Sequence, residues 1–287
     1  MNILYIGSSG ALSLVPFKEL LKENYTIAAV GIYKPVIFKN KVIAIENESL
    51  ALAANQCDIP IIDLSQSIDI TLKQCEHFSI DIILMSCYSK RLPDVLINCV
   101  NGRCFNMHPS LLPQYRGPEP IFWQFKEAAD LGVSWHRVVH EFDAGEVLIQ
   151  KKIIVDEGIS YADVNQQIAS TGAGLLMRLL PLESTLELPT DVPSNVIHNH
   201  YYPYPQPQDF TIENSWSAQH AYNFMRATQI FSLPYLYMDA YYQYSLKEAL
   251  DYDNNTDIDV VEVYKNRLYI PFKEGVLTAS YTDKMVI

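Results

Sequence analysis

The chain has 287 residues, of which 49% are hydrophobic and 19% charged, and its formal net charge is −12. A chain of this length can bury one large core or a medium and a small one, and the composition is typical of globular proteins, not of disordered segments. The net negative charge argues against a generally nucleic-acid-binding surface, because neutralising phosphates requires clustered lysines and arginines.

The N-terminal residues and the cysteines bear on the compartment. The start, MNILYIGSSG, lacks a basic region, and Gly and Ser interrupt its apolar run, so it resembles a first strand more than a signal peptide. No apolar run approaches the length that spans a membrane. The cysteines are odd in number without CxxC spacing, and we expect reduced, buried thiols in a cytoplasmic protein without a metal site. They are Cys57, Cys75, Cys87, Cys99 and Cys104.

Short apolar or β-branched runs alternate with helically spaced segments through the first 180 residues. Continuous apolar strands between helices favour a mostly parallel sheet that is covered on both faces, so the predicted fold class is α/β. Strands are predicted over residues 3–6, 27–32, 80–85, 133–139 and 147–155, and helical segments include 17–22, 50–55 and 161–180.

The sequence changes character after the last of these helices. Residues 181–210 hold six prolines and few periodic apolar residues, which is typical of a linker. A helix is predicted over 217–227, and alternating stretches at 259–264, 267–272 and 275–281 predict hairpins. We therefore expect a small β-rich domain at the C-terminal end.

The first predicted strand ends in Gly7-Ser8-Ser9-Gly10, directly before a helix. In a doubly wound sheet, such a turn can hold a phosphate on the amides of a helix N-terminus. The turn is not GxGxxG, and a turn of this kind equally often only connects a strand to a helix. Nucleotide binding and simple connection both stay open here.

The segment FNMHPSLLPQYRG, residues 105–117, places an amide, an imidazole and a hydroxyl at alternating positions. Alternating residues of a strand share one face, so Asn106, His108 and Ser110 are predicted to point the same way. They lie where a strand of the parallel sheet ends, which is the edge at which α/β sheets bind ligands. The segment therefore indicates a site.

A loop rich in carboxylates, HEFDAGE at residues 140–146, follows the strand predicted over 133–139. A carboxylate from this loop can orient His108 and stabilise its imidazolium, while Asn106 donates a hydrogen bond to an oxyanion. Such a set suits acyl transfer to an amine that the substrate supplies. The alternative is that His108 and His136 are polar core residues and that Asp-Ala-Gly is a common turn.

Several segments resemble the formyltransferases that use 10-formyltetrahydrofolate. FNMHPSLLPQYRG resembles their Asn-x-His-x-Ser-Leu-Leu-Pro-x-x-Arg-Gly signature, and GVSWHRVVHEFDAGEVLIQ resembles their second motif, Gly-Val-x-x-His followed by Asp-x-Gly. MNILYIGSSG and ILMSCYSKRLP fit the family's first strand and folate-pocket loop, so the resemblance covers residues 1–180. QDFTIENSWSAQHAYNFMRA is more faintly similar to the start of the C-terminal domain of methionyl-tRNA and sugar formyltransferases.

The resemblance implies a Rossmann-like catalytic domain over residues 1–182, a linker over 183–208 and a small, β-rich, OB-like C-terminal domain over 209–287. It also implies that 10-formyltetrahydrofolate is the co-substrate. Related sugar enzymes are often dimers, so a homodimer is one implied assembly, and no membrane partner is expected.

The resemblance assigns the catalytic roles to three residues. His108 would manage protons as an amine attacks the formyl carbon, Asn106 would stabilise the oxyanion, and Asp143 would hold His108 or a proton-carrying water. The residues that match the family's pterin site are Tyr88, Ser89, Lys90, Arg91, Leu92, Ser110, Leu111, Leu112, Pro113, His140, Glu141 and Phe142. Contacts to the acceptor are expected from Ser8, Ser9, Gly10, Arg116, Gly117 and Trp123.

The charge pattern bears on the acceptor. Methionyl-tRNA formyltransferases carry a basic loop after the second strand and a basic C-terminal domain, because they hold phosphates. Here the loop, YKPVIFKNKVIAIEN, is short and mildly basic. From residue 201 to the end the sequence contains eleven acidic and six basic residues. RGPEPIFWQF resembles the Phe-Trp pair of nucleotide-sugar N-formyltransferases and of formylating domains in peptide synthetases. The favoured acceptor is therefore a nucleotide-linked amino sugar, and nucleic acid is disfavoured.

Other acceptors stay open. Pro109-Ser110-Leu111 is closer to the tRNA, purine-pathway and peptide-synthetase members, so methionyl-tRNA and a peptide-synthetase-bound amino acid are alternatives. A purine-pathway role is less favoured, since those enzymes end near the first domain. An inactive, formyltransferase-like binding protein is a further alternative, but the retention of Asn106, His108 and Asp143 argues against it. Tyrosines clustered at 201–204 and 235–244 can stack a base, form an interface or belong to a core.

Overall fold

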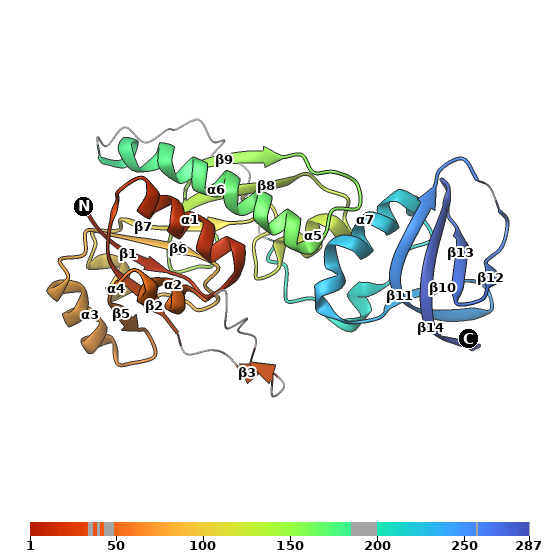
Figure 1. Ribbon diagram of the computed structural model, residues 1–287, viewed down its shortest axis with the longest axis horizontal. Coiled ribbons are helices and arrows are strands. Elements are labelled where there is room, and N and C mark those ends of the chain that lie inside the picture. The colour runs from red at the N-terminus through yellow and green to blue at the C-terminus, as the bar shows by residue number, and fades with distance from the viewer. Residues whose placement is uncertain (34–36, 39–40, 43–48, 185–199, 257, 287) are drawn as a thin grey trace. The chain divides into compact units, whose positions relative to one another are not determined.

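The computed structural model describes residues 1–287 apart from 34–36, 39–40, 43–48, 185–199, 257 and 287 (Figure 1). Its contacts divide the chain into two compact units. The predicted boundaries at residues 182 and 208 stay predictions, and most of the predicted linker lies outside the described residues. The first unit comprises residues 1–118, 131–153 and 165–201, and the second comprises 119–130, 154–164 and 202–287.

A seven-stranded sheet forms the centre of the first unit, in the order β5-β2-β1-β6-β7-β8-β9. The strands from β5 to β7 pair in parallel, whereas β8 pairs antiparallel with both β7 and β9. This confirms the predicted α/β fold with a mostly parallel sheet. The strands are β1 (Asn2–Ile6), β2 (Thr26–Ile32), β5 (Ile61–Asp63), β6 (Ile82–Ser86), β7 (Cys104–His108), β8 (Leu131–Arg137) and β9 (Val147–Ile153), and a separate ladder joins β3 (Ile37–Phe38) to β4 (Lys41–Val42).

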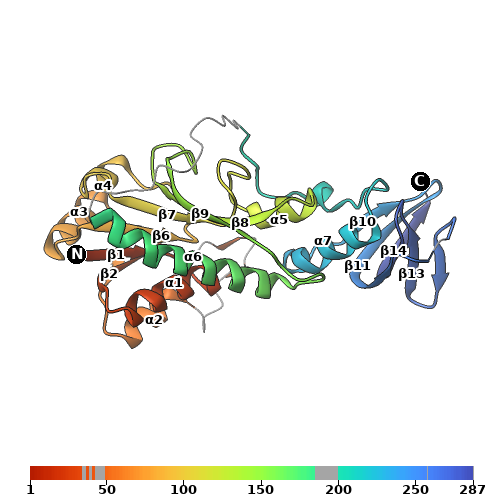
Figure 2. The same ribbon diagram turned by 90° about the horizontal axis from the view of Figure 1, so that it is seen from above.

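Helices cover both faces of this sheet (Figure 2). Leu4 of β1 belongs to one core cluster with Leu96 of a covering helix, whereas the ring of Tyr5 faces the other side and lies 5.7 Å from the ring of Phe17. The alternation of side chains along one strand therefore builds two separate cores. The helices are α1 (Gly10–Lys22), α2 (Leu50–Gln56), α3 (Ile68–His77), α4 (Asp94–Asn98) and α6 (Tyr161–Ser184).

Gly172 lets α6 approach the sheet closely. A Cβ at this position would overlap the Met107 sulfur of β7. The backbone oxygen of Gly172 accepts a hydrogen bond of 2.8 Å from the indole nitrogen of Trp135 in β8. Both contacts fall on the strands that carry Asn106 and His136, so α6 helps to fix the backbone on which these two side chains stand.

An antiparallel sheet in the order β10-β11-β14-β13-β12 belongs to the second unit. Aromatic rings form much of its core, and the ring of Phe122 lies 5.0–5.4 Å from those of Phe210, Phe224 and Phe231. The predicted β-rich C-terminal part is confirmed, although β10 and β11 have no counterpart among the predicted elements. The elements are α5 (Pro120–Lys126), α7 (Ala218–Thr228), β10 (Tyr235–Met238), β11 (Tyr242–Asp253), β12 (Glu262–Tyr264), β13 (Arg267–Pro271) and β14 (Val276–Val286).

All five cysteines have free thiols. Cys75 and Cys104 are buried, as predicted, but Cys57, Cys87 and Cys99 are exposed, so the prediction of burial is wrong for these three. Two of them, Cys57 and Cys99, cap the C-terminal ends of α2 and α4, where a helix turns outward to solvent. The helices in the described ranges include none with both the length and the apolar character of a membrane span.

Glu119 directly precedes α5 and is half-buried, and burial raises the pKa of its carboxyl to about 7. The folded state thus disfavours the charged form, so the carboxyl destabilises the fold progressively as the pH rises from the unfolded-state pKa of about 4.3. We expect Glu119→Gln to raise the free energy of unfolding by about 1–2 kcal/mol at pH 8 and to leave it unchanged at pH 4.

Thermal melting of both proteins at the two pH values measures this effect. Glu262→Gln is the matched control, because Glu262 is exposed on β12 and its removal should give no such pH-dependent gain. An equal gain for Glu119→Gln at pH 4 and pH 8 would contradict the assignment.

Candidate active site

The end of β7 and the neighbouring β8 bring two polar side chains together. The antiparallel register places Asn106 directly opposite His136 and His108 opposite Ser134. The amide nitrogen of Asn106 lies 3.0 Å from Nε2 of His136. His108 and His136 are only 4% and 2% exposed, so their ring nitrogens depend on protein partners for hydrogen bonds.

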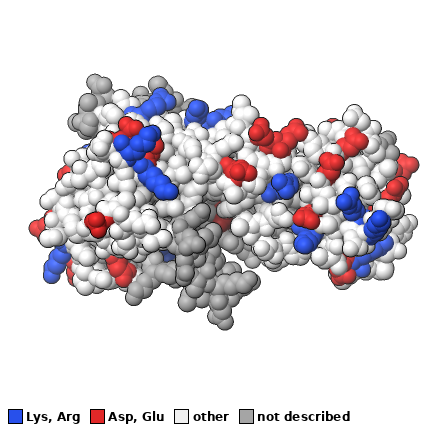
Figure 3. Space-filling view, viewed as in Figure 1, with Lys and Arg blue, Asp and Glu red and all other residues white. Residues whose placement is uncertain are grey.

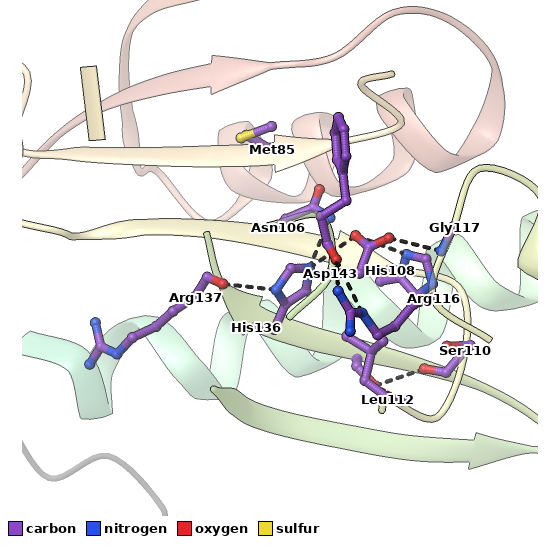
Figure 4. A network of polar contacts seen from close by, with 12 residues as sticks. Met85, Asn106, His108, Ser110, Leu112, Arg116, Gly117, His136, Arg137 and Asp143 are labelled. Carbon is purple, nitrogen blue, oxygen red and sulfur yellow. Dashed lines mark hydrogen bonds and ion pairs between the residues drawn. The ribbon is translucent and has the colours of Figure 1, made fainter. Parts of the chain in front are cut away.

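Asp143 reaches this pair from the loop between β8 and β9 (Figure 4). Its Oδ1 lies 3.5 Å from Nδ1 of His108 and 3.6 Å from Nε2 of His136. Its Oδ2 accepts a hydrogen bond of 3.0 Å from the backbone nitrogen of Gly117. The predicted trio of Asn106, His108 and Asp143 therefore lies together, and its catalytic role stays a prediction.

The conformation of the loop explains the Asp-Ala-Gly sequence. Asp143 has a φ of 53°, which an aspartate tolerates better than most residues. A Cβ on Gly145 would overlap the backbone oxygen of Arg137, so only glycine fits at this position. The turn thus folds back tightly against the end of β8 and delivers the Asp143 carboxylate to the two histidines.

The hydrogen bonds of His108 fix where its proton lies. Nε2 is 2.9 Å from the backbone oxygen of Tyr115, and a carbonyl oxygen only accepts, so Nε2 carries a hydrogen. In neutral His108 the lone pair is then on Nδ1, which faces Asp143. A proton that arrives on Nδ1 would lie between the imidazole and the carboxylate, whose negative charge would stabilise the imidazolium.

His136 has the opposite arrangement. Its Nδ1 lies 2.8 Å from the backbone oxygen of Arg137 and must be the donor, so Nε2 of the neutral ring is an acceptor. Burial lowers the pKa of His136 to about 4, against the opposing effect of Asp143. His136 is therefore neutral near pH 7, and its Nε2 accepts a hydrogen from the Asn106 amide.

Ser110 does not lie on the strand face with Asn106 and His108, and this prediction is wrong. β7 ends at His108, so Ser110 falls in the following turn and its hydroxyl donates to the backbone oxygen of Gln114 at 2.7 Å. The hydroxyl of Ser134 in turn donates to the backbone oxygen of Ser110 at 2.7 Å. The turn at residues 110–114 is therefore held by its own hydrogen bond and by Ser134, and the pterin contacts predicted for residues 110–113 stay predictions.

A pocket that is open to solvent lies beside Asn106 and Asp143. It brings together most of the predicted folate residues, namely Tyr88, Lys90, Arg91, Leu92, His140, Glu141 and Phe142. Its other lining residues are Met85, His136, Val138 and Val139, which were not predicted to line it. Met85 lies in β6 just before the predicted folate loop, and His136 belongs to the Gly-Val-x-x-His motif, so the motifs carried a signal for both.

The rim of this pocket carries positive charge next to aromatic rings. The Arg91 guanidinium lies 5.4 Å from the centre of the Phe142 ring, and its Nη1 is 3.3 Å from Nε2 of His140. The ammonium of Lys90 lies 4.9 Å from the centre of the Tyr33 ring. Apolar walls with cations at the rim suit a flat ring that carries carboxylates at one end.

The residues predicted for the acceptor lie at different places. Arg116 donates to the backbone oxygen of Phe142 through Nε at 3.1 Å and Nη2 at 2.6 Å, so it and Gly117 hold the Asp143 loop. Ser8, Ser9 and Gly10 lie where β1 meets α1, and Ser8 donates to the backbone oxygen of Cys87. Trp123 belongs to the second unit, where its indole donates to the backbone oxygen of Pro203. Contact of these residues with an acceptor stays a prediction.

Tyr201 belongs to the tyrosine cluster noted at residues 201–204, but the sequence did not place it beside the Asp143 loop. Its backbone forms a parallel bridge with Arg116, and its ring lies 6.5 Å from the ring of Phe142. Burial and then the charge of Asp143 raise the pKa of its hydroxyl, while Arg116 opposes this shift. The side chain is 44% exposed, so it is available to a ligand next to the Asp143 loop.

Comparisons with known proteins agree with this geometry. Residues 62–180 match the family described as formyl transferase. The methionyl-tRNA formyltransferase of Synechococcus sp. (strain JA-3-3Ab) is 31% identical over 137 residues, which are 47% of this chain and 42% of that protein. The chain thus aligns with less than half of that relative's length.

Two solved structures resemble almost the whole chain. A sugar 3N-formyltransferase, WlaRD, solved with dTDP and 5-N-formyl-THF, has a TM-score of 0.70 at 19% identity and covers 99% of each chain. An N-formyltransferase from Helicobacter canadensis, solved with folinic acid and dTDP-3-aminofucose, has a TM-score of 0.69 at 16% identity and covers 97% of this chain and 98% of its own. At these identities the likeness is one of fold.

The matched residues 62–180 include Asn106, His108 and Asp143, and they include every residue that lines the pocket. The resemblance to formyltransferases is therefore confirmed, and residues 62–180 match the formyl transferase family.

Proposed function

We propose that the protein is an N-formyltransferase that moves the formyl group of 10-formyltetrahydrofolate to the amine of a nucleotide-linked amino sugar. The observation that carries this proposal is that Asn106 and Asp143 line one pocket of the first unit, and that Nδ1 of His108 lies 3.5 Å from Oδ1 of Asp143. The pocket fits the folate in chemical character, because Met85, Leu92 and Phe142 offer apolar walls to a pterin and Lys90 and Arg91 offer charge to its glutamate.

The three residues account for the proton and charge movements of the transfer. A bond forms between the acceptor nitrogen and the formyl carbon, and the bond from that carbon to N10 of the folate breaks. Asn106 donates an amide hydrogen to the oxygen that becomes negative. His108 accepts the proton that the attacking amine loses, on Nδ1, and can return it to N10, so the atoms balance without a further reactant. Asp143 stabilises the imidazolium during this step.

Two features support an amino-sugar acceptor. The fold likeness to two sugar N-formyltransferases runs along the whole chain, including the second unit. Residues 201–287 contain eleven acidic and six basic residues. Figure 3 shows the lysines and arginines of this part interspersed with carboxylates on the face drawn. Such a surface suits a small acceptor better than a long polyanion.

Methionyl-tRNA is the second candidate acceptor, because the sequence match is to methionyl-tRNA formyltransferases. These matches fall on the part of the chain that carries the chemistry, which acceptors of either kind would share. The acidic C-terminal part disfavours this candidate. The homodimer and the cytoplasmic location stay predictions.

The acceptor can be identified directly. The protein is incubated with 10-formyltetrahydrofolate and a panel of dTDP-, UDP- and GDP-linked amino sugars, with charged initiator tRNA as a separate arm. We expect tetrahydrofolate release by absorbance and, by mass spectrometry, one sugar nucleotide heavier by the mass of CO. Release only with the tRNA would refute the sugar acceptor, and absence of transfer in both arms would contradict the proposed acceptors.

The roles of His108 and Asp143 can be tested on the same substrate. His108→Ala should lower kcat by about 10²–10⁴-fold, because it removes the base, while folate binding stays within a few fold. Asp143→Asn keeps an oxygen for the Gly117 amide but loses the charge, and we expect at least a tenfold loss of kcat. His77→Ala is the control, since His77 is exposed at the end of α3. Full activity in either site variant would exclude the role given to that residue.

A further inference from the structure

We propose that His136 is a positioning residue that fixes which way round the Asn106 amide lies. Its neutral ring presents a lone pair to Asn106 and so holds the amide nitrogen, not the amide oxygen, on the side of His108 and Asp143. This inference rests on the proposed formyl transfer, in which Asn106 acts as a hydrogen-bond donor.

The contact between the two side chains is direct. Asn106 and His136 are cross-strand partners of β7 and β8, and their Nδ2 and Nε2 atoms are 3.0 Å apart. In Figure 4 the Asn106 oxygen points away from His136, and a dashed line joins the amide to the His136 ring. One amide hydrogen is thereby committed to His136, and the second remains for the substrate oxygen.

The orientation of the amide depends on the proton of His136. Nδ1 is 2.8 Å from the backbone oxygen of Arg137, which requires the hydrogen to be on Nδ1. The Arg137 oxygen is itself fixed in place. Gly145 packs against this oxygen, and the Arg137 nitrogen donates a hydrogen bond to the backbone oxygen of Glu146. The turn after β8 therefore sets the tautomer of His136, and the tautomer sets the orientation of Asn106.

The surroundings of the ring keep it neutral. The ring is 2% exposed, and the groups that act on it are Asp143 at 3.6 Å, His108 with ring centres 6.4 Å apart, and the more distant Arg116. Burial outweighs the attraction of Asp143 and lowers the pKa of the ring to about 4. A neutral Nε2 without hydrogen would repel a flipped Asn106 oxygen, since two acceptors would then face each other.

The same arrangement keeps Asp143 for His108. Both ring nitrogens lie at similar distances from Oδ1 of Asp143, 3.5 Å for His108 and 3.6 Å for His136. Because Nε2 of His136 carries no hydrogen, only a protonated His108 can donate to this oxygen. The alternative is that His136 only fills the space opposite Asn106, in which case His136→Phe would keep its activity.

Kinetics of variants on the identified acceptor test the inference. His136→Phe fills a similar space without an acceptor and should lower kcat by about 10–100-fold, with the KM for the folate within about twofold. His136→Gln can donate to the Arg137 oxygen with its nitrogen and accept from Asn106 with its oxygen, so it should recover most of the lost kcat. Equal losses in the Phe and Gln variants would overturn the proposal.

The double variant separates positioning from packing. If His136 acts through Asn106, His136→Phe should have no further effect on kcat in an Asn106→Ala background. Losses that multiply in the double variant would mean that His136 acts independently of Asn106, and the proposal would be wrong. A wild-type protein that transfers formyl to no acceptor would instead refute the proposed function.

Nitrogen NMR of the wild-type protein tests the same arrangement without turnover. With ¹⁵N-labelled histidine, the resonances of His136, assigned by comparison with His136→Gln, should show a protonated Nδ1 and an unprotonated Nε2 at pH 7. A hydrogen on Nε2, or a charged ring at this pH, would overturn the proposal even if the variants are inactive.

Discussion

The candidate site depends on the close approach of Gly145 to the backbone oxygen of Arg137, because this approach shapes the turn between β8 and β9. A side chain at Gly145 would push the turn away from the strand, and Asp143 would lose its position between His108 and His136. The Arg137 oxygen is also the acceptor for His136. One backbone contact thus determines both where the carboxylate lies and which ring nitrogen of His136 carries hydrogen.

The two histidines of the site differ because the backbone oxygens around them differ. Tyr115 binds the Nε2 hydrogen of His108, which leaves Nδ1 for a proton beside Asp143, whereas Arg137 binds the Nδ1 hydrogen of His136. Two identical side chains at similar distances from one carboxylate therefore carry their hydrogen on different ring nitrogens, which fits His108 to the proposed role of base and His136 to that of hydrogen-bond acceptor. Residue type alone does not separate these roles, since the backbone partners become known only with the fold.

The sequence predicted the features that depend on local pattern. Apolar runs located β1, β2, β6, β8 and β9 of the first sheet but not the short β5, and two motifs located Asn106, His108 and Asp143. The alternating pattern predicted Ser110 on the strand face, and this was wrong. β7 ends at His108, because Pro109 has no N–H with which to continue the strand pairing. The assignment of residues 119–130 to the second unit depends on contacts of Phe122 with rings about a hundred residues away along the chain, and no local pattern reports such contacts.

The choice of acceptor involves residues outside the shared motifs. In the proposed reaction Asn106, His108 and Asp143 would serve any amine, because they would act only on the formyl group and on a proton. Arg116 belongs to a motif, but its Nε and Nη2 are already engaged by the Phe142 oxygen, so its geometry mainly serves the loop. Tyr201 joins the same loop through its bridge to Arg116 and leaves 44% of its side chain exposed. Discrimination between amines is therefore expected to lie in positions such as Tyr201, which can change without disturbing the hydrogen bonds that hold Asp143.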